Sequence, residues 1–367
     1  MAVKIGKINR PFLILTIILV TGGFFIFSSA SLGILARNEV EFSSVALNKL
    51  FYGLFFGSIA CLFFARVDYH VWKKYSLFFF VGSILLTLAV FSPIGIEHGG
   101  AKRWIDLGFI SFQPAEFLKI AFIIYFAAWL SGLKEKVSTF SWGLLPFLIF
   151  SGILGAILLT QPDTDTLAVI IFAALAMYTA SGAKWRHVLL ILLAGVAVLT
   201  VLYFTRPYIK QRIEVMLDPS ANNQTSGYQL NQSLIAVGSG QIWGRGFGQS
   251  IQKFHYLPEP MGDSVFAVAA EEFGFVGAFA IIAIFIIFGL EGLKISSRAS
   301  DNFGRLLSLG IVILIVSQAL INIGGMVGIL PLTGIPLPFI SQGGTALLIT
   351  LVEVGIIMNI SRSSKKQ

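Results

Sequence analysis

Charged residues are scarce in this chain: Asp, Glu, Lys and Arg make up 12% of its 367 residues, whereas 56% are hydrophobic. A soluble protein needs a polar, charged exterior, so this composition excludes a soluble fold. Cysteine is nearly absent, and because Cys61 is the only one, an internal disulfide is excluded. The few histidines show no metal-ligand spacing. Alternating strands of the membrane-barrel type are missing as well.

Long apolar runs are abundant instead, and each has the length that a hydrocarbon core about 30 Å thick requires. Spans are predicted near 11–36, 46–65, 75–92, 114–132, 142–160, 165–182, 186–205, 263–290, 305–329 and 341–361. The first run has no small-residue cleavage site, so it is predicted to be retained. No repeat or low-complexity linker interrupts the chain. The sequence therefore predicts an all-α integral membrane protein, with residues 1–367 forming one polytopic bundle of about ten transmembrane helices.

Basic residues set the expected orientation of these spans. The formal net charge is +8, yet Lys and Arg sit in short clusters between apolar runs rather than on one face, so a nucleic-acid partner is not expected. Most of them fall on one side if the N-terminus is cytoplasmic. The positive-inside rule then places both termini in the cytoplasm. The loops 93–113 and 206–262 face outward, the latter as a large extracytoplasmic loop between spans seven and eight.

Asp263 ends the long polar loop, at the predicted start of the next span. A carboxylate at that depth is costly unless it has a function. Asp263 could act as a general base that takes a proton from a sugar hydroxyl. It could also be the N-cap or a first-turn acid of the helix that begins there, because acids favour helix N-termini. Both interpretations remain open at this stage.

Two clusters near residues 102–119 carry further charges. Glu116 and Lys119 are three residues apart on a predicted helix, so they share a face and can pair. They either face a polar cavity or form a structural ion pair. Lys102 and Arg103 lie outside, against the positive-inside trend, which favours an anionic ligand such as a lipid diphosphate. Contact with headgroups of membrane lipid is the alternative.

Other polar positions have more than one interpretation. Asp163 and Asp165 lie in a turn between two spans, where they could hold a divalent cation or cap the next helix. The acids 271–272 lie inside a span and need a partner, for which Lys119 is a candidate. The glycines at 244–248 are expected to allow tight turns. The segment 328–344 contains three prolines, which predict an irregular backbone lining an outer cavity.

Taken together, these segments resemble the SEDS family of membrane proteins, and its division-type branch, FtsW, more than its elongation-type branch, RodA. The matching order and spacing run along nearly the whole chain. The segments are FSSAS at 27–31, GGAKRWIDLG at 99–108, FQPAEFLK at 112–119, QPD at 161–163, SGYQLNQSLIAVGSG at 226–240, GRGFGQSIQKFHYLPEP at 244–260, Asp263, AEEFGF at 270–275 and GIPLPFISQGG at 334–344.

The resemblance implies a peptidoglycan glycosyltransferase of the bacterial cytoplasmic membrane that polymerises lipid II together with a class B penicillin-binding protein. It implies that Asp263 is the catalytic aspartate. Glu116 and Lys119 take the family's polar pair, and Arg103 a basic position near the cavity. With Lys102 these residues are the expected substrate-binding set. A divalent cation or the basic pair would offset charge on the leaving diphosphate.

Three departures from the family pattern stand out. Met261-Gly262 replaces His-Thr before the acid, Gln342 replaces a tyrosine, and Asp163-Thr-Asp165 replaces Asp-Leu-Gly. The acid itself is retained and is expected to act with an ordinary pKa, ionised at neutral pH. The role expected is septal wall synthesis. The alternatives are an elongation-type polymerase, a flippase for a lipid-linked precursor, and a non-enzymatic scaffold for a penicillin-binding protein.

Overall fold

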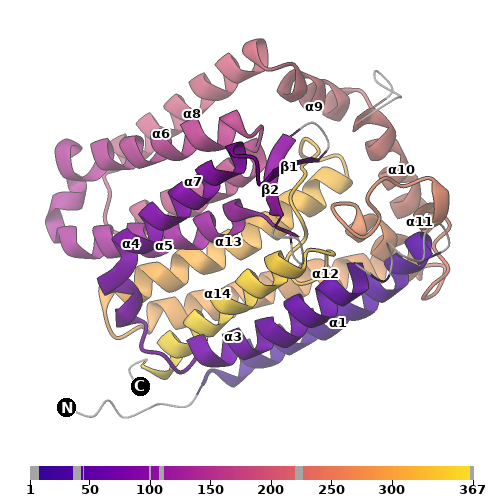
Figure 1. Cartoon of the computed structure of the whole chain (residues 1–367), viewed down its shortest axis with the longest axis horizontal. Coiled ribbons are helices and arrows are strands. Elements are labelled where there is room, and N and C mark those ends of the chain that lie inside the picture. Colours follow the sequence, from indigo (N-terminus) through magenta and orange to yellow (C-terminus); the bar gives the residue numbers. More distant parts are fainter. Residues whose placement is uncertain are drawn as a thin grey trace.

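The computed structural model describes residues 8–35, 43, 45–98, 101–106, 111–219 and 226–363, and this part of the chain is mostly helical (Figure 1). The first half contains α1 (Arg10–Leu35), the π-helical segment η1 (Asn48–Phe56), α3 (Gly57–Phe64), α4 (His70–Leu88), β1 (Gly95–His98), β2 (Ala101–Asp106), β3 (Ser111–Phe112), α5 (Pro114–Leu133) and α6 (Leu145–Thr160). The second half contains α7 (Thr164–Ala180), α8 (Trp185–Thr205), α9 (Pro207–Leu217), α10 (Ser226–Ser239), α11 (Gln252–His255), α12 (Val265–Ser297), α13 (Asn302–Met326) and α14 (Gly344–Arg362).

Within these described residues, nine helices are long and apolar enough to cross a membrane. They correspond to nine of the ten predicted spans, the second of which consists of η1 and α3. The tenth, α7, is apolar but only 17 residues long. It is shorter because a turn at 161–163 precedes it and Gly182, with a φ of 100°, follows it. The helical membrane bundle predicted from the apolar runs is confirmed.

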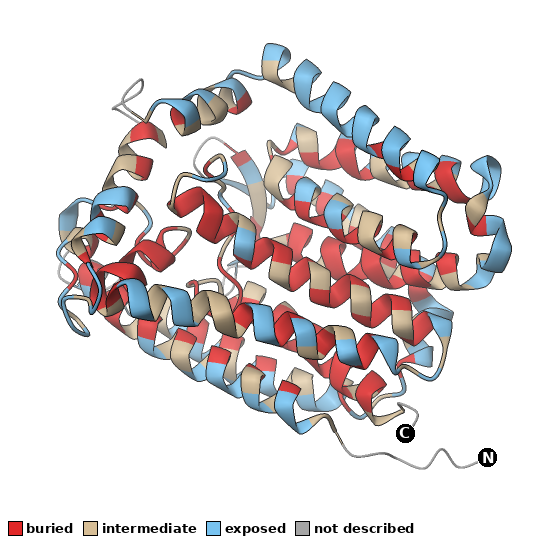
Figure 2. Ribbon diagram, turned by 180° about the vertical axis from the view of Figure 1, so that it is seen from behind, coloured by how far each residue is buried: buried red, intermediate tan, exposed pale blue. Residues whose placement is uncertain are grey.

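Helices α13 and α14 lie at the centre of the bundle. About 72% of the most apolar stretch of each is buried, against 11% for α8. Helix α13 packs against α5, α7 and α12, and α14 packs against η1 and α3. Figure 2 shows the contrast, with buried central helices and a pale-blue α8 along the upper edge. The central helices therefore form a protein-lined framework, whereas α8 is mostly exposed on the outside.

A small antiparallel sheet in the segment 93–113, which was expected to be a loop, departs from the all-α prediction. Its strand order is β1-β2-β3, with Ile96 opposite Trp104 and Ile105 opposite Phe112. β-branched and aromatic residues fit such a half-buried pleated surface. Strand β2 is paired with β1 and β3 and packs against α5, so the sheet fixes the backbone around Arg103.

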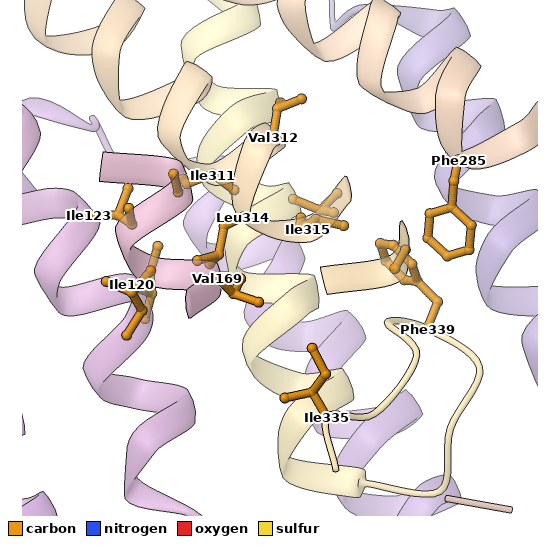
Figure 3. Close-up of a cluster of buried hydrophobic side chains, with 14 of the residues drawn as sticks. Ile120, Ile123, Val169, Phe285, Ile311, Val312, Leu314, Ile315, Ile335 and Phe339 are labelled. Atoms are coloured by element: carbon orange, nitrogen blue, oxygen red, sulfur yellow. The ribbon is translucent and has the colours of Figure 1, made fainter. Parts of the chain in front are cut away.

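The segment 331–343 between α13 and α14 has no regular secondary structure and enters the core. Ile335 and Phe339 are 4% and 3% exposed, and Figure 3 shows both side chains near residues of α12 and α13. The irregular backbone expected from the three prolines is confirmed. The irregular segment 331–343 therefore lies against buried side chains.

Helix α12 is broken at Gly274, whose φ of 65° is outside the helical range. The loop 241–246 compensates for the break. The N–H groups of Arg245 and Gly246 donate to the carbonyls of Glu271 and Glu272, at 3.0 and 2.9 Å. Gly244 also has a positive φ, of 80°, and packs against the break, which confirms the expected tight turn there.

Candidate functional site

Asp263 lies in the loop just before α12. The helix begins at Val265, with Ser264 at the cap position and no side-chain cap bond, so Asp263 is not the cap of this helix. Asn322 Nδ2 donates to the Asp263 carbonyl over 2.9 Å. Among the described residues, no donor is hydrogen-bonded to the Asp263 carboxylate. The capping interpretation is wrong, and the carboxylate is available to a ligand.

Two arginines and Asp263 converge around Gly334 in the irregular segment 331–343. A Cβ atom built on Gly334 would lie 3.7 Å from Asp263 Oδ2, 3.8 Å from Arg212 Nη2 and 4.0 Å from Arg103 Nη1. Gly334 is exposed, so this point is open to solvent. A loop, the helix α9 and the strand β2 thus bring one acid and two cations to a single accessible position.

Arg103 is held in place by the turn between α6 and α7. Its Nε donates to the carbonyl of Gln161 over 2.9 Å, and its Nη2 donates to the carbonyl of Pro162. These two bonds orient the guanidinium and leave Nη1 directed at Gly334. Arg103 thus lies near Asp263, and its contact with a substrate stays a prediction.

Lys102 is exposed and takes no part in this arrangement. Successive residues of a strand point to opposite faces, so the side chain next to Arg103 in β2 points away from Asp263. Lys102 therefore lies apart from Arg103 in this structure, and its contact with a substrate stays a prediction. Its position suits contact with lipid headgroups, the alternative raised from the sequence.

Arg212 was not predicted, because nothing local in the sequence distinguishes it from the other basic residues of the long loop. It pairs with both oxygens of Asp165, at 3.0 and 2.8 Å, and Asp165 Oδ2 accepts the Gly334 N–H over 2.9 Å. Both contacts come from Nη1, and these charge-assisted hydrogen bonds hold that nitrogen beside Asp165. The segment predicted as one loop, 206–262, in fact contains three helices, of which α9 presents Arg212 to the site.

Burial raises the pKa of Asp263 to about 7, with the carboxylates of Glu259 and Asp165 adding to the shift and the guanidinium groups of Arg212 and Arg103 opposing it. The ordinary pKa expected from the sequence is therefore wrong. A carboxyl group that titrates near neutral pH suits proton transfer at that pH. Burial also raises the pKa of Asp163, which caps α7 by accepting the Thr166 N–H, so its capping role is confirmed.

Glu116 and Lys119 form the predicted pair, 2.8 Å apart, and are 5% and 3% exposed. Lys119 also donates to Gln318 Oε1 over 2.7 Å, and Gln318 Nε2 donates to the Pro336 carbonyl over 2.9 Å. The pair thus lies beneath the irregular segment 331–343 and is connected to it through Gln318. Contact with substrate at these two residues stays a prediction.

The predicted pairing of Lys119 with the acids of α12 is wrong. Glu272 pairs with Lys253 at 2.7 Å, and both are almost fully buried. Glu271 accepts from Ser250 Oγ at 2.5 Å and lies 3.4 Å from Arg245 Nε. These partners come from the loop that precedes α12, which folds back onto it. Across the described ranges, no three His, Cys, Asp or Glu side chains gather where they could hold a metal ion.

Comparison with known proteins agrees with this fold. The family model of the FtsW, RodA and SpoVE group, described as "Cell cycle protein", matches residues 9–366. Stage V sporulation protein E of Bacillus subtilis (strain 168) is 36% identical and covers 96% of each chain. A probable peptidoglycan glycosyltransferase FtsW of Geobacter metallireducens (strain ATCC 53774 / DSM 7210 / GS-15) is 40% identical, over 84% of this chain and 83% of that one.

Two solved structures have the same fold. One is described as "Structural coordination of polymerization and crosslinking by a peptidoglycan synthase complex" and matches with a TM-score of 0.80 and 24% identity, over 98% of this chain and 99% of that one. The rod shape determining protein RodA of Thermus thermophilus matches with a TM-score of 0.71 and 23% identity, over the same shares. Because the family model spans nearly the whole chain and the sequence relatives exceed 30% identity, the chain belongs to the FtsW, RodA and SpoVE family of membrane proteins.

Proposed function

We propose that this protein is a peptidoglycan glycosyltransferase that polymerises lipid II at the outer face of the cytoplasmic membrane during septal wall synthesis. The observation that carries the proposal is the Asp263 carboxylate, which has a pKa of about 7 and lies beside two arginines. Relatives named as probable FtsW glycosyltransferases, 33–40% identical, support the reaction and the septal role.

The proposed reaction is an inverting glycosyl transfer. Asp263 takes the proton from the 4-hydroxyl of the GlcNAc of an acceptor lipid II. The oxygen forms a bond to C1 of the MurNAc at the end of the donor strand, and the bond from C1 to the diphosphate breaks with its electron pair on the leaving oxygen. Undecaprenyl diphosphate departs. Asp263 then releases its proton to solvent.

Arg103 and Arg212 are proposed to bind the diphosphate. Guanidinium groups suit phosphate oxygens, and cations positioned in advance stabilise charge that develops on a leaving group. Both arginines are already oriented by protein acceptors, so little reorganisation is needed when the substrate arrives. Glu116 and Lys119 are proposed to support the same substrate from beneath the irregular segment 331–343.

The orientation follows from the basic residues at one end of the bundle. The start of α1 and the end of α14 lie side by side, where Ser361 Oγ accepts the N–H of Asn9 over 3.3 Å. Arg362 at this end donates to the Ala65 carbonyl. Under the positive-inside rule we infer that both termini are cytoplasmic and that residues 206–262 are extracytoplasmic. We also propose a class B penicillin-binding protein as partner, because one structural relative comes from a peptidoglycan synthase complex.

The proposal is tested by incubating purified lipid II with the protein and its partner synthase, and separating the glycan products. We expect chains from the wild type and none from Asp263→Asn. Chains from both proteins would exclude Asp263 as the base. Absence of chains from both would contradict the transferase, and lipid II translocation would then test the flippase alternative.

A further inference from the structure

Three consecutive carbonyl groups before α12 each accept a hydrogen bond from the last part of the chain. The Gln342 N–H donates to the Met261 carbonyl over 2.8 Å, and Ser341 Oγ donates to the Gly262 carbonyl over 2.7 Å. Asn322 Nδ2 donates to the Asp263 carbonyl over 2.9 Å. The backbone that carries the acid is therefore fixed, although no described donor is hydrogen-bonded to its carboxylate.

Two of these donors also connect to the irregular segment 331–343. Asn322 Nδ2 donates to the Ile335 carbonyl over 2.9 Å, and Ser341 Oγ accepts the Leu337 N–H over 2.8 Å. Each side chain thus joins the Asp263 loop to the segment that carries Gly334. Asn322 is fully buried and Ser341 is 4% exposed, so loss of either would leave buried polar groups unpaired.

We propose that Asn322 and Ser341 are positioning residues that hold the Asp263 carboxylate at the point where Arg103 and Arg212 converge. The inference rests on the proposed glycosyl transfer. Neither residue has to touch the substrate, because each acts through the backbone at Gly262 and Asp263.

The identity of Asn322 agrees with this role. Both protons of one amide are used on two carbonyls from different segments, which an aspartate or a leucine could not provide. Its Oδ1 is buried and, in the described part of the chain, has no hydrogen-bond partner. An unpaired buried acceptor costs stability, so this site retains an arrangement that stability alone does not favour.

The hydrogen bonds of Asn322 and Ser341 to the Asp263 loop are called the clamp below. Their loss would slow the reaction step more than it would weaken substrate binding. A reacting group displaced by about 1 Å can lose roughly a hundredfold in rate. The charged groups that face Asp263 are Glu259 from its own loop, Asp165 from α7, Arg103 from β2 and Arg212 from α9. Burial is the largest cause of its raised pKa, so a carboxylate free to move towards water would have a lower pKa.

The test compares Asn322→Ala and Ser341→Ala with the wild type and with Asn359→Ala. Asn359 is a matched control at the opposite end of the bundle, because its amide also makes two hydrogen bonds to backbone of another segment: it accepts the Tyr69 N–H and donates to the Ala65 carbonyl. Ser341→Thr retains the hydroxyl group. Polymerisation by protein with its partner is measured from about pH 5 to about pH 9, and kcat and KM are separated.

We expect kcat to fall at least about tenfold in both alanine variants, with KM within about twofold and the pH of half-maximal rate shifted lower. Ser341→Thr and Asn359→Ala should keep most of the wild-type kcat. An equal loss in Asn359→Ala, or a loss with an unchanged pH profile, would overturn the inference. If Asn322→Ala does not fold, the two Ser341 variants decide.

Failure of the proposed function is distinguishable, because the wild type itself would then make no chains. In that case the apparent pKa of Asp263 still tests the clamp. It is obtained from the difference in thermal stability between each variant and the same variant carrying Asp263→Asn, measured across pH. A pKa that is lower in Asn322→Ala and Ser341→Ala than in wild type supports the clamp, and an unchanged pKa overturns it.

Discussion

Asp263→Asn should make the protein more stable at pH 8 while removing its activity. The folded-state pKa of about 7 exceeds the ordinary value of 3.8, so the native state holds a proton that the unfolded chain releases. Stability therefore falls as pH rises from about 4 to about 7, and the full penalty is present above pH 7. Asparagine resembles the neutral acid and avoids that penalty.

The magnitude follows from the displacement of the pKa. Moving it from 3.8 to about 7 disfavours the ionised form by ~4 kcal/mol, at about 1.36 kcal/mol per pKa unit. Asp263 is only half-buried, so solvent screening reduces this upper limit, and we expect ~2 kcal/mol. The gain should be visible as a higher thermal unfolding temperature in detergent at pH 8 and should disappear near pH 4.

Asp165→Asn is the matched control, because the same chemical change at the same site breaks the ion pair with Arg212. It should lower thermal stability at pH 8. An Asp263→Asn protein that is equally or less stable than its parent at pH 8 would refute the reasoning. So would a gain of the same size at pH 4 and pH 8. In the wild type, polymerisation should rise with pH and reach half its maximum near pH 7.

Three further substitutions test other parts of the structure. Gly334→Ala places a methyl group 3.7–4.0 Å from the acid and the two arginines. The unfolding temperature should equal that of the wild type, whereas the rate of polymerisation should fall about tenfold. Full activity would show that no substrate atom occupies this space. Lys253→Met removes the cation that pairs with the buried Glu272 carboxylate and should lower the free energy of unfolding by ~3 kcal/mol. The exposed control Lys294→Met should lower it by less than ~1 kcal/mol, and equal losses in the two variants would contradict this. Gly274→Ala is blocked by its positive φ and by backbone 2.3 Å away, so folded protein should not accumulate, whereas Gly22→Ala, in open space, should fold normally.

Much of the fold could be predicted from the sequence, because membrane spans are encoded in local apolar runs. Each predicted span corresponds to a helix, and only α7, with 17 residues, is too short to count among the nine long apolar helices of the described residues. The pair of Glu116 and Lys119 was also predictable, since residues three apart on a helix share a face. These features depend on neighbours within a few turns of the same segment.

The rest depends on contacts between distant segments. Arg212 meets Asp165 from a helix 47 residues further on, and no periodicity in α9 marks it. The pKa of Asp263 depends on burial beneath other segments, which no local pattern reveals. The sheet at 95–112 consists of strands too short to give a clear alternation, and so the sequence predicts only a loop there.

The break in α12 at Gly274 makes this helix dependent on the loop beside it. The Phe275 and Val276 N–H groups donate to the carbonyls of Gln241 and Ile242, at 2.8 and 3.2 Å. Hydrocarbon offers no substitute for such partners, so this helix completes its hydrogen bonding only with loop 241–246 beside it. The part of α12 after Gly274 is therefore complete as a membrane helix only together with the loop 241–246, so these two stretches form one unit.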